Sequence, residues 1–257
     1  MKKRKRTAEP SLSERIMTAK VKTGRVVDHL RYLLALHANN AIVSYSPTLA
    51  AQIPTSYAAN AFRTFQEGLH RFEIVRLCAL WDGVDPDKEN IPTIVDLIDR
   101  PEVLDALADE TVSAWGAMEG VVETSSEDAE VQRAVEETIK ASNLAFGKQQ
   151  AEKAQKRLRG AITEARNLTA SGKLASIMNL RDKSLAHSLA ATRREKDGPI
   201  EPMKVGYERD ILNASVEIVD ALHIGINNAS FDFTQTRHIC EKNAKALWEA
   251  CTFDIKR

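Results

Sequence analysis

Apolar residues recur at helical spacing along nearly the whole chain, and no segment shows the sustained apolar–polar alternation of a strand bounded by hairpin turns. The first helical stretch covers residues 13 to about 43, with Ser11 or Ser13 as its candidate N-cap. Because the same periodicity continues to the end of the chain, it predicts an all-α protein, a helical bundle with short connections.

The most apolar stripe of the chain covers residues 62–81 and has Thr55 or Ser56 as its candidate N-cap. Further on, Pro101 suits the first turn of another helix. The segment 123–130, ETSSEDAE, is expected to be a loop or a new helix start. The other expected helices cover residues 94–99, 101–118, 129–144, 149–168, about 171–191, 207–228 and 236–253.

Size and composition indicate one globular domain, residues 11–257, preceded by a flexible basic N-terminus of residues 1–10. There is no apolar run of 18 residues, and no apolar stretch follows the basic MKKRKR, so we expect neither a membrane span nor a secretory signal. The three cysteines are widely spaced and lack a CxxC pair, which indicates neither disulfides nor a zinc site. A cytoplasmic location is expected.

Charge is unevenly distributed although the formal net charge is zero. Residues 82–137 contain 17 acidic side chains against 3 basic ones, and residues 145–196 contain 12 basic against 4 acidic. Such runs are often only solvated helix faces, but a basic third is also what a polyanion would bind.

The segment 179–189, NLRDKSLAHSL, lies within the basic third and holds an unexpected pair of polar residues. On the expected helix, Leu174, Ile177, Met178, Arg181 and Leu185 form one stripe, so a guanidinium falls on the apolar face and needs an anionic partner. The histidine at position 187 would lie about 120° away on an ideal helix. Either the helix is distorted after the arginine, or a second copy of the chain supplies the facing surface of a two-fold dimer.

The stretch RDKSLAH resembles the signature of the HEPN superfamily, in which an Arg is followed, after four to six residues, by a His. Residues 53–82, IPTSYAANAFRTFQEGLHRFEIVRLCALWD, are similar to the first helical region of the abortive-infection (AbiU2-like) branch of that superfamily. The resemblance covers most of residues 46–194. It implies an all-helical HEPN-type domain with additional helices, and a metal-independent endoribonuclease that needs no cofactor.

In such an enzyme two copies of the motif meet at a homodimer interface, and RNA is cut by attack of its own 2′-hydroxyl. The resemblance assigns proton transfer to His187, phosphate binding to Arg181 and an orienting role to Asp182. It also implies a toxin or antiphage effector of abortive infection, with an antitoxin or sensor protein as a possible partner. The expected products are a 2′,3′-cyclic phosphate and a 5′-hydroxyl.

Basic residues around the motif are the candidates for contacts with RNA phosphates. An alternative interpretation uses the same residues in a catalytically inactive HEPN-like module that binds nucleic acid or protein. A metal centre is disfavoured, because only Glu67 and His70 form a Glu-x-x-His pair, and Asp220 and His223 do not complete a second. The candidate RNA contacts are Lys153, Lys156, Arg157, Arg159, Lys183, Arg193 and Arg194.

Overall fold

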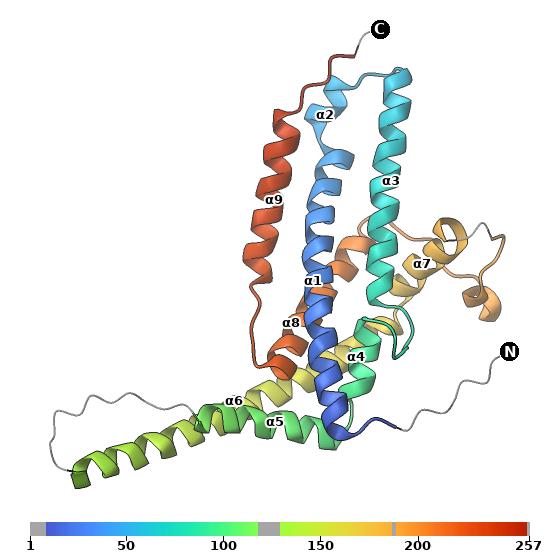
Figure 1. Cartoon of the computed structure of the whole chain (residues 1–257). Coiled ribbons are helices and arrows are strands. Elements are labelled where there is room, and N and C mark those ends of the chain that lie inside the picture. The colour runs from blue at the N-terminus through green and yellow to red at the C-terminus, as the bar shows by residue number, and fades with distance from the viewer. Residues whose placement is uncertain (1–8, 118–128, 187–188, 256–257) are drawn as a thin grey trace.

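The computed structural model describes residues 9–117, 129–186 and 189–255. These residues form nine α-helices and no strand, which confirms the predicted all-α fold (Figure 1). Most of the basic N-terminus and of the segment 123–130 lies outside the described residues. The helices are α1 (Leu12–Tyr45), α2 (Pro47–Gln52), α3 (Tyr57–Leu80), α4 (Ile91–Ile98), α5 (Pro101–Gly116), α6 (Ala129–Thr169), α7 (Gly172–Leu180), α8 (Tyr207–Asn227) and α9 (Phe233–Ala250).

Helix α1 is the central element, and α3, α4, α8 and α9 all contact it. Its start confirms the predicted first helix, with Ser11 rather than Ser13 as the N-cap. The Ser11 hydroxyl accepts from the Glu14 amide at 3.3 Å, and the Glu14 carboxylate accepts from the Ser11 amide at 2.8 Å. This reciprocal pair satisfies two amides that a bare helix end would leave without partners.

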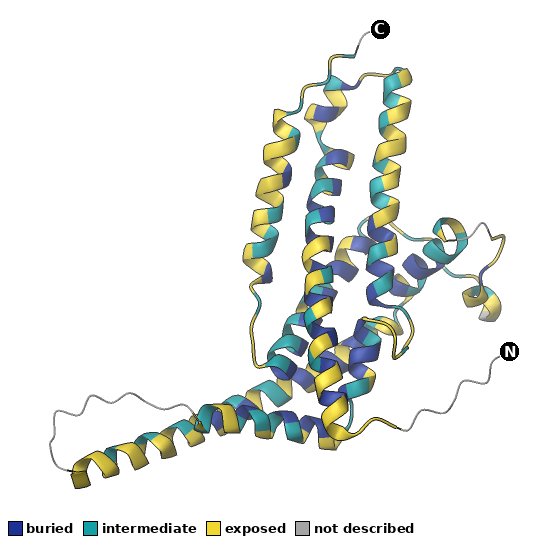
Figure 2. Cartoon of the chain, in the orientation of Figure 1, coloured by how far each residue is buried: buried dark blue, intermediate teal, exposed yellow. Residues whose placement is uncertain are grey.

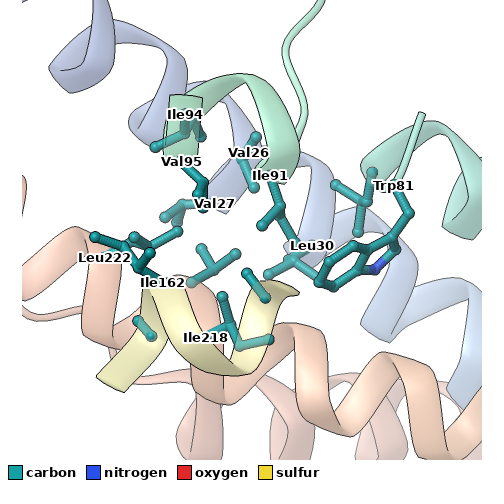
Figure 3. Close-up of a cluster of buried hydrophobic side chains, with 14 of the residues drawn as sticks. Val26, Val27, Leu30, Trp81, Ile91, Ile94, Val95, Ile162, Ile218 and Leu222 are labelled. Atoms are coloured by element: carbon teal, nitrogen blue, oxygen red, sulfur yellow. The ribbon is translucent and has the colours of Figure 1, made fainter. Parts of the chain in front are cut away.

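The hydrophobic core lies where α1 crosses α4, α6 and α8 (Figure 3). Leu30 of α1 is fully buried there, close to Ile162 of α6 and Ile218 of α8. Trp81, directly after α3, is also buried and donates its indole N–H to the hydroxyl of Ser215 at 2.9 Å. A buried indole needs such an acceptor, and this bond attaches the end of α3 to α8.

Helix α3 begins at the predicted cap, since the Ser56 hydroxyl accepts from the Ala59 amide at 3.2 Å. Only its last third, from residue 73 onward, belongs to the core, however: Phe65 and Phe72 are 46% and 43% exposed. The first half of α3 extends beyond the body of the molecule alongside α1 (Figure 2). The apolar stripe at its start therefore has fewer neighbours than the periodicity predicted, although Phe65 contacts the Trp248 ring of α9 at 6.3 Å between centroids.

Outside the motif, the structure differs from the predicted helices at two places. The helices expected at 129–144 and 149–168 are one helix, α6, which packs along α5. Close approach there depends on Gly147, because a Cβ at that position would lie 2.9 Å from the Cβ of Trp115. Helix α2 was not expected, yet Ser46 caps it and Pro47 occupies its first turn.

Shortening one core side chain tests this packing. We expect Leu30→Ala to lower the free energy of unfolding by about 2–5 kcal/mol, because it removes fully buried methyl groups and leaves a cavity. The matched control is Leu247→Ala, at a position 55% exposed, with an expected change within about 0.5 kcal/mol. Urea unfolding followed by circular dichroism measures both; equal losses in the two variants would contradict the assigned core.

Candidate active site

Helix α7 brings the motif to the edge of the core. As predicted, it begins after Ser171, whose hydroxyl accepts from the Leu174 amide at 3.2 Å. Leu174, Ile177 and Met178 are buried, which confirms the apolar stripe. The next member of that stripe is Arg181, whose side chain is only 16% exposed.

The α-helix ends at Leu180, so its predicted continuation to about residue 191 is wrong. Residues Arg181–Leu185 form a π-helix, η1, in which the Ala186 amide donates to the Arg181 carbonyl at 2.8 Å. A distortion directly after the arginine was one of the two arrangements expected. Because the π turn is wider than an α turn, the 120° offset calculated for an ideal helix does not apply. The other motif residue, His187, lies outside the described residues.

The chain folds back after the motif instead of continuing as a helix. The Asn179 amide group donates to the Glu195 carboxylate at 3.1 Å and accepts from the Thr192 hydroxyl at 2.5 Å. A straight helix would carry Thr192 about 20 Å from Asn179 at 1.5 Å per residue. These bonds therefore fix the return of residues 192–195, part of which forms a short 3-10 helix, η2 (Arg193–Asp197).

The guanidinium of Arg181 is held by two carboxylates. Its Nη1 donates to Asp82, in the loop after α3, at 2.5 Å, and its Nε donates to Asp182 at 2.8 Å. Its Nη2 also lies 2.7 Å from Asp182. Burial acts to lower the pKa of Arg181, but the bonds to Asp82 and Asp182 outweigh it and raise the pKa. The predicted anionic partner is therefore present, and the guanidinium stays charged.

Lys88 and Arg194 add two further cations to this group. We call the five residues together the motif cluster: Lys88, Asp82, Arg181, Asp182 and Arg194. Lys88 lies 3.2 Å from Asp82, and Arg194 donates to Asp182 at 2.9 Å. Burial acts to raise the pKa of Asp182, but hydrogen bonds from Arg194 and Arg181 hold it below its usual value. Asp182 is thus ionised at neutral pH, and the motif cluster combines three cationic side chains with two carboxylates.

Cys78 of α3 is buried and interacts electrostatically with Arg181 and Asp182. Burial raises the pKa of its thiol to about 12, and the nearby guanidinium of Arg181 offsets only part of that rise. At neutral pH the thiol therefore stays protonated, which argues against a role as a thiolate nucleophile.

Sequence reasoning did not anticipate Asp82 as the partner of Arg181, which lies 99 residues further along the chain. It did assign Asp82 to the segment that resembles the HEPN superfamily, as the last residue of CALWD. A carboxylate in such a segment was the only available signal. Its pairing depends on how α3 and α7 are placed by the core, and Trp81 holds the end of α3 there.

The predicted RNA contacts fall into two groups. Lys183 and Arg194 lie at the motif and are already in ion pairs, with Glu195 and Asp182 respectively. Arg193 is exposed nearby in η2. The others are exposed on α6 and line no part of the motif cluster; they are Lys153, Lys156, Arg157 and Arg159.

An open cavity of about 520 Å³ between α1 and α3 adjoins the motif cluster, because Asp82 and Lys88 are among its lining residues. Arg76 of α3 also lines it, and its Nε is buried without a hydrogen-bond partner in the described structure. On the opposite wall His29 has its pKa lowered to about 4, by burial first and then by the charge of Arg76. The cavity thus offers a guanidinium and a neutral imidazole beside Asp82.

The two acid–histidine pairs do not form a metal site in the described structure. The Glu67 carboxylate pairs with Arg63 and Arg71, each at 3.2 Å. No group of three His, Cys, Asp or Glu side chains among the described residues is arranged to hold a metal ion. Across the same part of the chain, no helix has the length and apolar character that a membrane crossing requires.

An all-helical bundle whose Arg-x₅-His motif begins at a half-buried, carboxylate-bound arginine is consistent with the HEPN-type domain that the sequence resembles. Comparison with protein families agrees, since the HEPN family model described as AbiU2 matches residues 20–247. The chain belongs to this AbiU2 family of HEPN proteins, which confirms the resemblance seen in the sequence. No curated protein and no solved structure matched the chain in the corresponding searches.

The ion pairs of Asp182 make stability depend on pH. The pKa of Asp182 is lower in the folded protein than in the unfolded chain, where it is about 3.9. Its carboxylate therefore stabilises the folded protein above that pH, and this stabilisation is lost as the pH falls through the pKa of the folded state. We expect Asp182→Asn to destabilise the protein by about 1–3 kcal/mol near neutral pH. The difference from the parent protein should shrink below about pH 4, as measured by urea unfolding over a series of pH values.

The control is Asp28→Asn, whose carboxylate is 72% exposed and pairs with Arg31 on the same helix. Its effect should stay within about 0.5 kcal/mol at every pH. A difference between Asp182→Asn and the parent that does not change with pH would show that the carboxylate charge is not what stabilises the motif.

Proposed function

We propose that the chain is a metal-independent endoribonuclease that cleaves RNA by attack of the 2′-hydroxyl on the adjacent phosphate. The observation that supports this most directly is the arginine of the motif, which is half-buried, permanently charged and oriented by Asp82 and Asp182. A guanidinium fixed in this way is suited to a phosphate whose charge grows in the transition state.

Arg181 keeps hydrogen-bond donors for that phosphate. Each of its terminal nitrogens carries two hydrogens, while Nη1 contacts one carboxylate oxygen and Nη2 another. The cationic side chains of the motif cluster favour the approach of an anion, and Lys183 and Arg194 are the nearest predicted RNA contacts. Asp182 acts as a positioning residue, because its lowered pKa makes it a poor base.

In the proposed reaction the 2′-oxygen loses its proton to one imidazole and bonds to phosphorus. The bond from phosphorus to the 5′-oxygen breaks, and a second imidazole gives that oxygen a proton. The products are a 2′,3′-cyclic phosphate and a 5′-hydroxyl, so the proton balance needs no metal. His187 is the imidazole in both roles if two copies of the motif face each other across a two-fold axis.

Membership of the AbiU2 family supports abortive infection as the setting, in which RNA cleavage stops the growth of an infected cell. An enzyme of this kind needs restraint in healthy cells. We therefore include an antitoxin or sensor protein as a proposed partner, in addition to RNA and the second copy of the chain.

Cleavage of RNA in EDTA tests the reaction. We expect the parent protein to cut RNA and to leave cyclic phosphate ends, and His187→Ala to reduce the rate by about 10²–10⁴ because general acid–base catalysis is lost. Arg181→Ala should also lose activity and should no longer stop bacterial growth on expression. Rates are measured with end-labelled RNA on denaturing gels.

Matched controls are His238→Ala, an exposed histidine of α9, and Arg63→Ala, whose side chain is 78% exposed on α3. Both should cut RNA like the parent. Equal cleavage by His187→Ala and the parent would rule out this mechanism. If the parent binds RNA without cutting it, the chain is instead the inactive binding module.

Mixing the parent protein with an inactive variant tests the shared site. We expect the parent protein to lose cleavage when it is unfolded together with an excess of the inactive His187→Ala protein and refolded as mixed dimers. The reason is that a mixed dimer keeps only one of the two imidazoles that the reaction uses. The rate is compared with that of the two proteins refolded separately and then combined; mixed dimers, verified by sedimentation, that cleave at half the parent rate or faster would exclude a composite site.

A further inference from the structure

A second cavity, of about 450 Å³, lies where the hairpin of α5 and α6 meets the end of α8. We call it the hairpin cavity. Its volume falls in the range of sites that bind small ligands. It shares no lining residue with the motif cluster, and in Figure 1 the hairpin extends away from α7. The residues that could contact a ligand there are Trp115, Gln150, Lys153, Arg157, Asn228 and Ser230.

Two cations line this cavity. Lys153 and Arg157 are one turn apart on α6, where like charges repel each other. Neither makes an ion pair with any described residue, and none of the described lining residues is acidic. Asp220 of α8, outside the lining, interacts electrostatically with Arg157, and burial raises the pKa of that carboxyl. The cavity is therefore positive, as an anion site requires.

An aromatic side chain forms part of the same wall. Trp115 is half-buried, and its ring meets Phe146 edge to face, with 4.7 Å between centroids. Gly147 allows this close approach of α5 to α6, so Trp115 is held by the packing of two helices. An indole held in place beside two cations can bind a nucleotide, because the base stacks on the ring and the phosphate contacts the cations.

Hydrogen-bonding groups complete the wall on the α8 side. Asn228, which ends α8, adopts a left-handed conformation with φ 51°, and its side-chain oxygen accepts from the Thr111 hydroxyl at 2.7 Å. This bond ties α8 to α5, and it leaves the amide nitrogen of Asn228 as a donor next to Ser230 and Gln150.

We propose that the hairpin cavity binds a nucleotide, with its phosphate on Lys153 and Arg157 and its base on Trp115. The nucleotide is either free in solution or one unit of an RNA strand, since both present the same phosphate and base. The ligand is bound here and is not cut, so the proposal stands apart from the cleavage reaction at the motif.

Binding to the full-length protein is measured by quenching of tryptophan fluorescence and by calorimetry. The probes are AMP, adenosine and a short 2′-O-methylated RNA, which has no free 2′-hydroxyl and stays intact. We expect AMP or the RNA to bind and adenosine to bind at least tenfold more weakly, because it lacks the phosphate. Binding of the RNA but not of AMP assigns the cavity to a strand, and binding of AMP assigns it to a free nucleotide.

The chain offers matched controls on the same helix. Lys153→Gln and Arg157→Gln should each weaken binding at least tenfold, and Lys153→Arg should restore it. Lys140→Gln and Lys148→Gln, at exposed positions of α6 outside the cavity lining, should bind AMP like the parent. Trp115→Leu should weaken binding and remove most of the quenching. Thermal unfolding of each variant verifies that it is folded.

Three results would overturn the proposal. The first is that neither AMP nor the RNA binds to the parent protein. The second is equal weakening by Lys153→Gln and Lys148→Gln, which indicates a general effect of charge. The third is binding that resists Lys153→Gln but is lost in Arg181→Ala, which would assign the nucleotide to the motif cluster.

Discussion

The motif region is organised around one guanidinium that water reaches only poorly. Removing a charged group from water costs several kcal/mol unless opposite charges and hydrogen bonds replace the solvent. Arg181 obtains this compensation from Asp82, at the end of the apolar α3, and from its neighbour Asp182. The ion pair with Asp82 therefore requires α3 and α7 to be correctly placed, and the hydrogen bond from Trp81 to Ser215 holds α3 in that place.

The same pairing determines what a phosphate meets at the motif. An incoming phosphate approaches an arginine that is already charged and oriented, so little conformational freedom is lost on binding. It must also tolerate two carboxylates, which Lys88 and Arg194 neutralise from the outside. With one more positive than negative side chain, the motif cluster attracts a phosphate but does not bind it tightly. Weak binding of the substrate suits an enzyme, because only interactions that strengthen in the transition state accelerate the reaction.

The sequence predicted most helices and their caps because helix formation depends on neighbours within one turn. Ser11 and Ser56 were each one of two candidate caps that a few surrounding residues indicated, and both cap their helices. A distortion at Arg181 was expected only as one of two arrangements, and the return of Thr192 to Asn179 was not predicted, since it arises from a contact between separate segments. The partner of Arg181 was missed for the same reason: periodicity predicts that a buried charge needs a counter-ion, but only the tertiary structure identifies Asp82.

The uneven charge of the chain has a partly internal explanation. Some cations of the basic third pair with acids of the preceding segment: Arg181 with Asp82, and Arg166 with Asp99 of the α4–α5 connection. Internal pairing of this kind explains why a local count of charges cannot by itself identify a polyanion site. The informative cations are those that folding leaves without a carboxylate and also gathers in a concave wall. On α6 this distinguishes Lys153 and Arg157 from Lys156 and Arg159, although all four looked equivalent in the sequence.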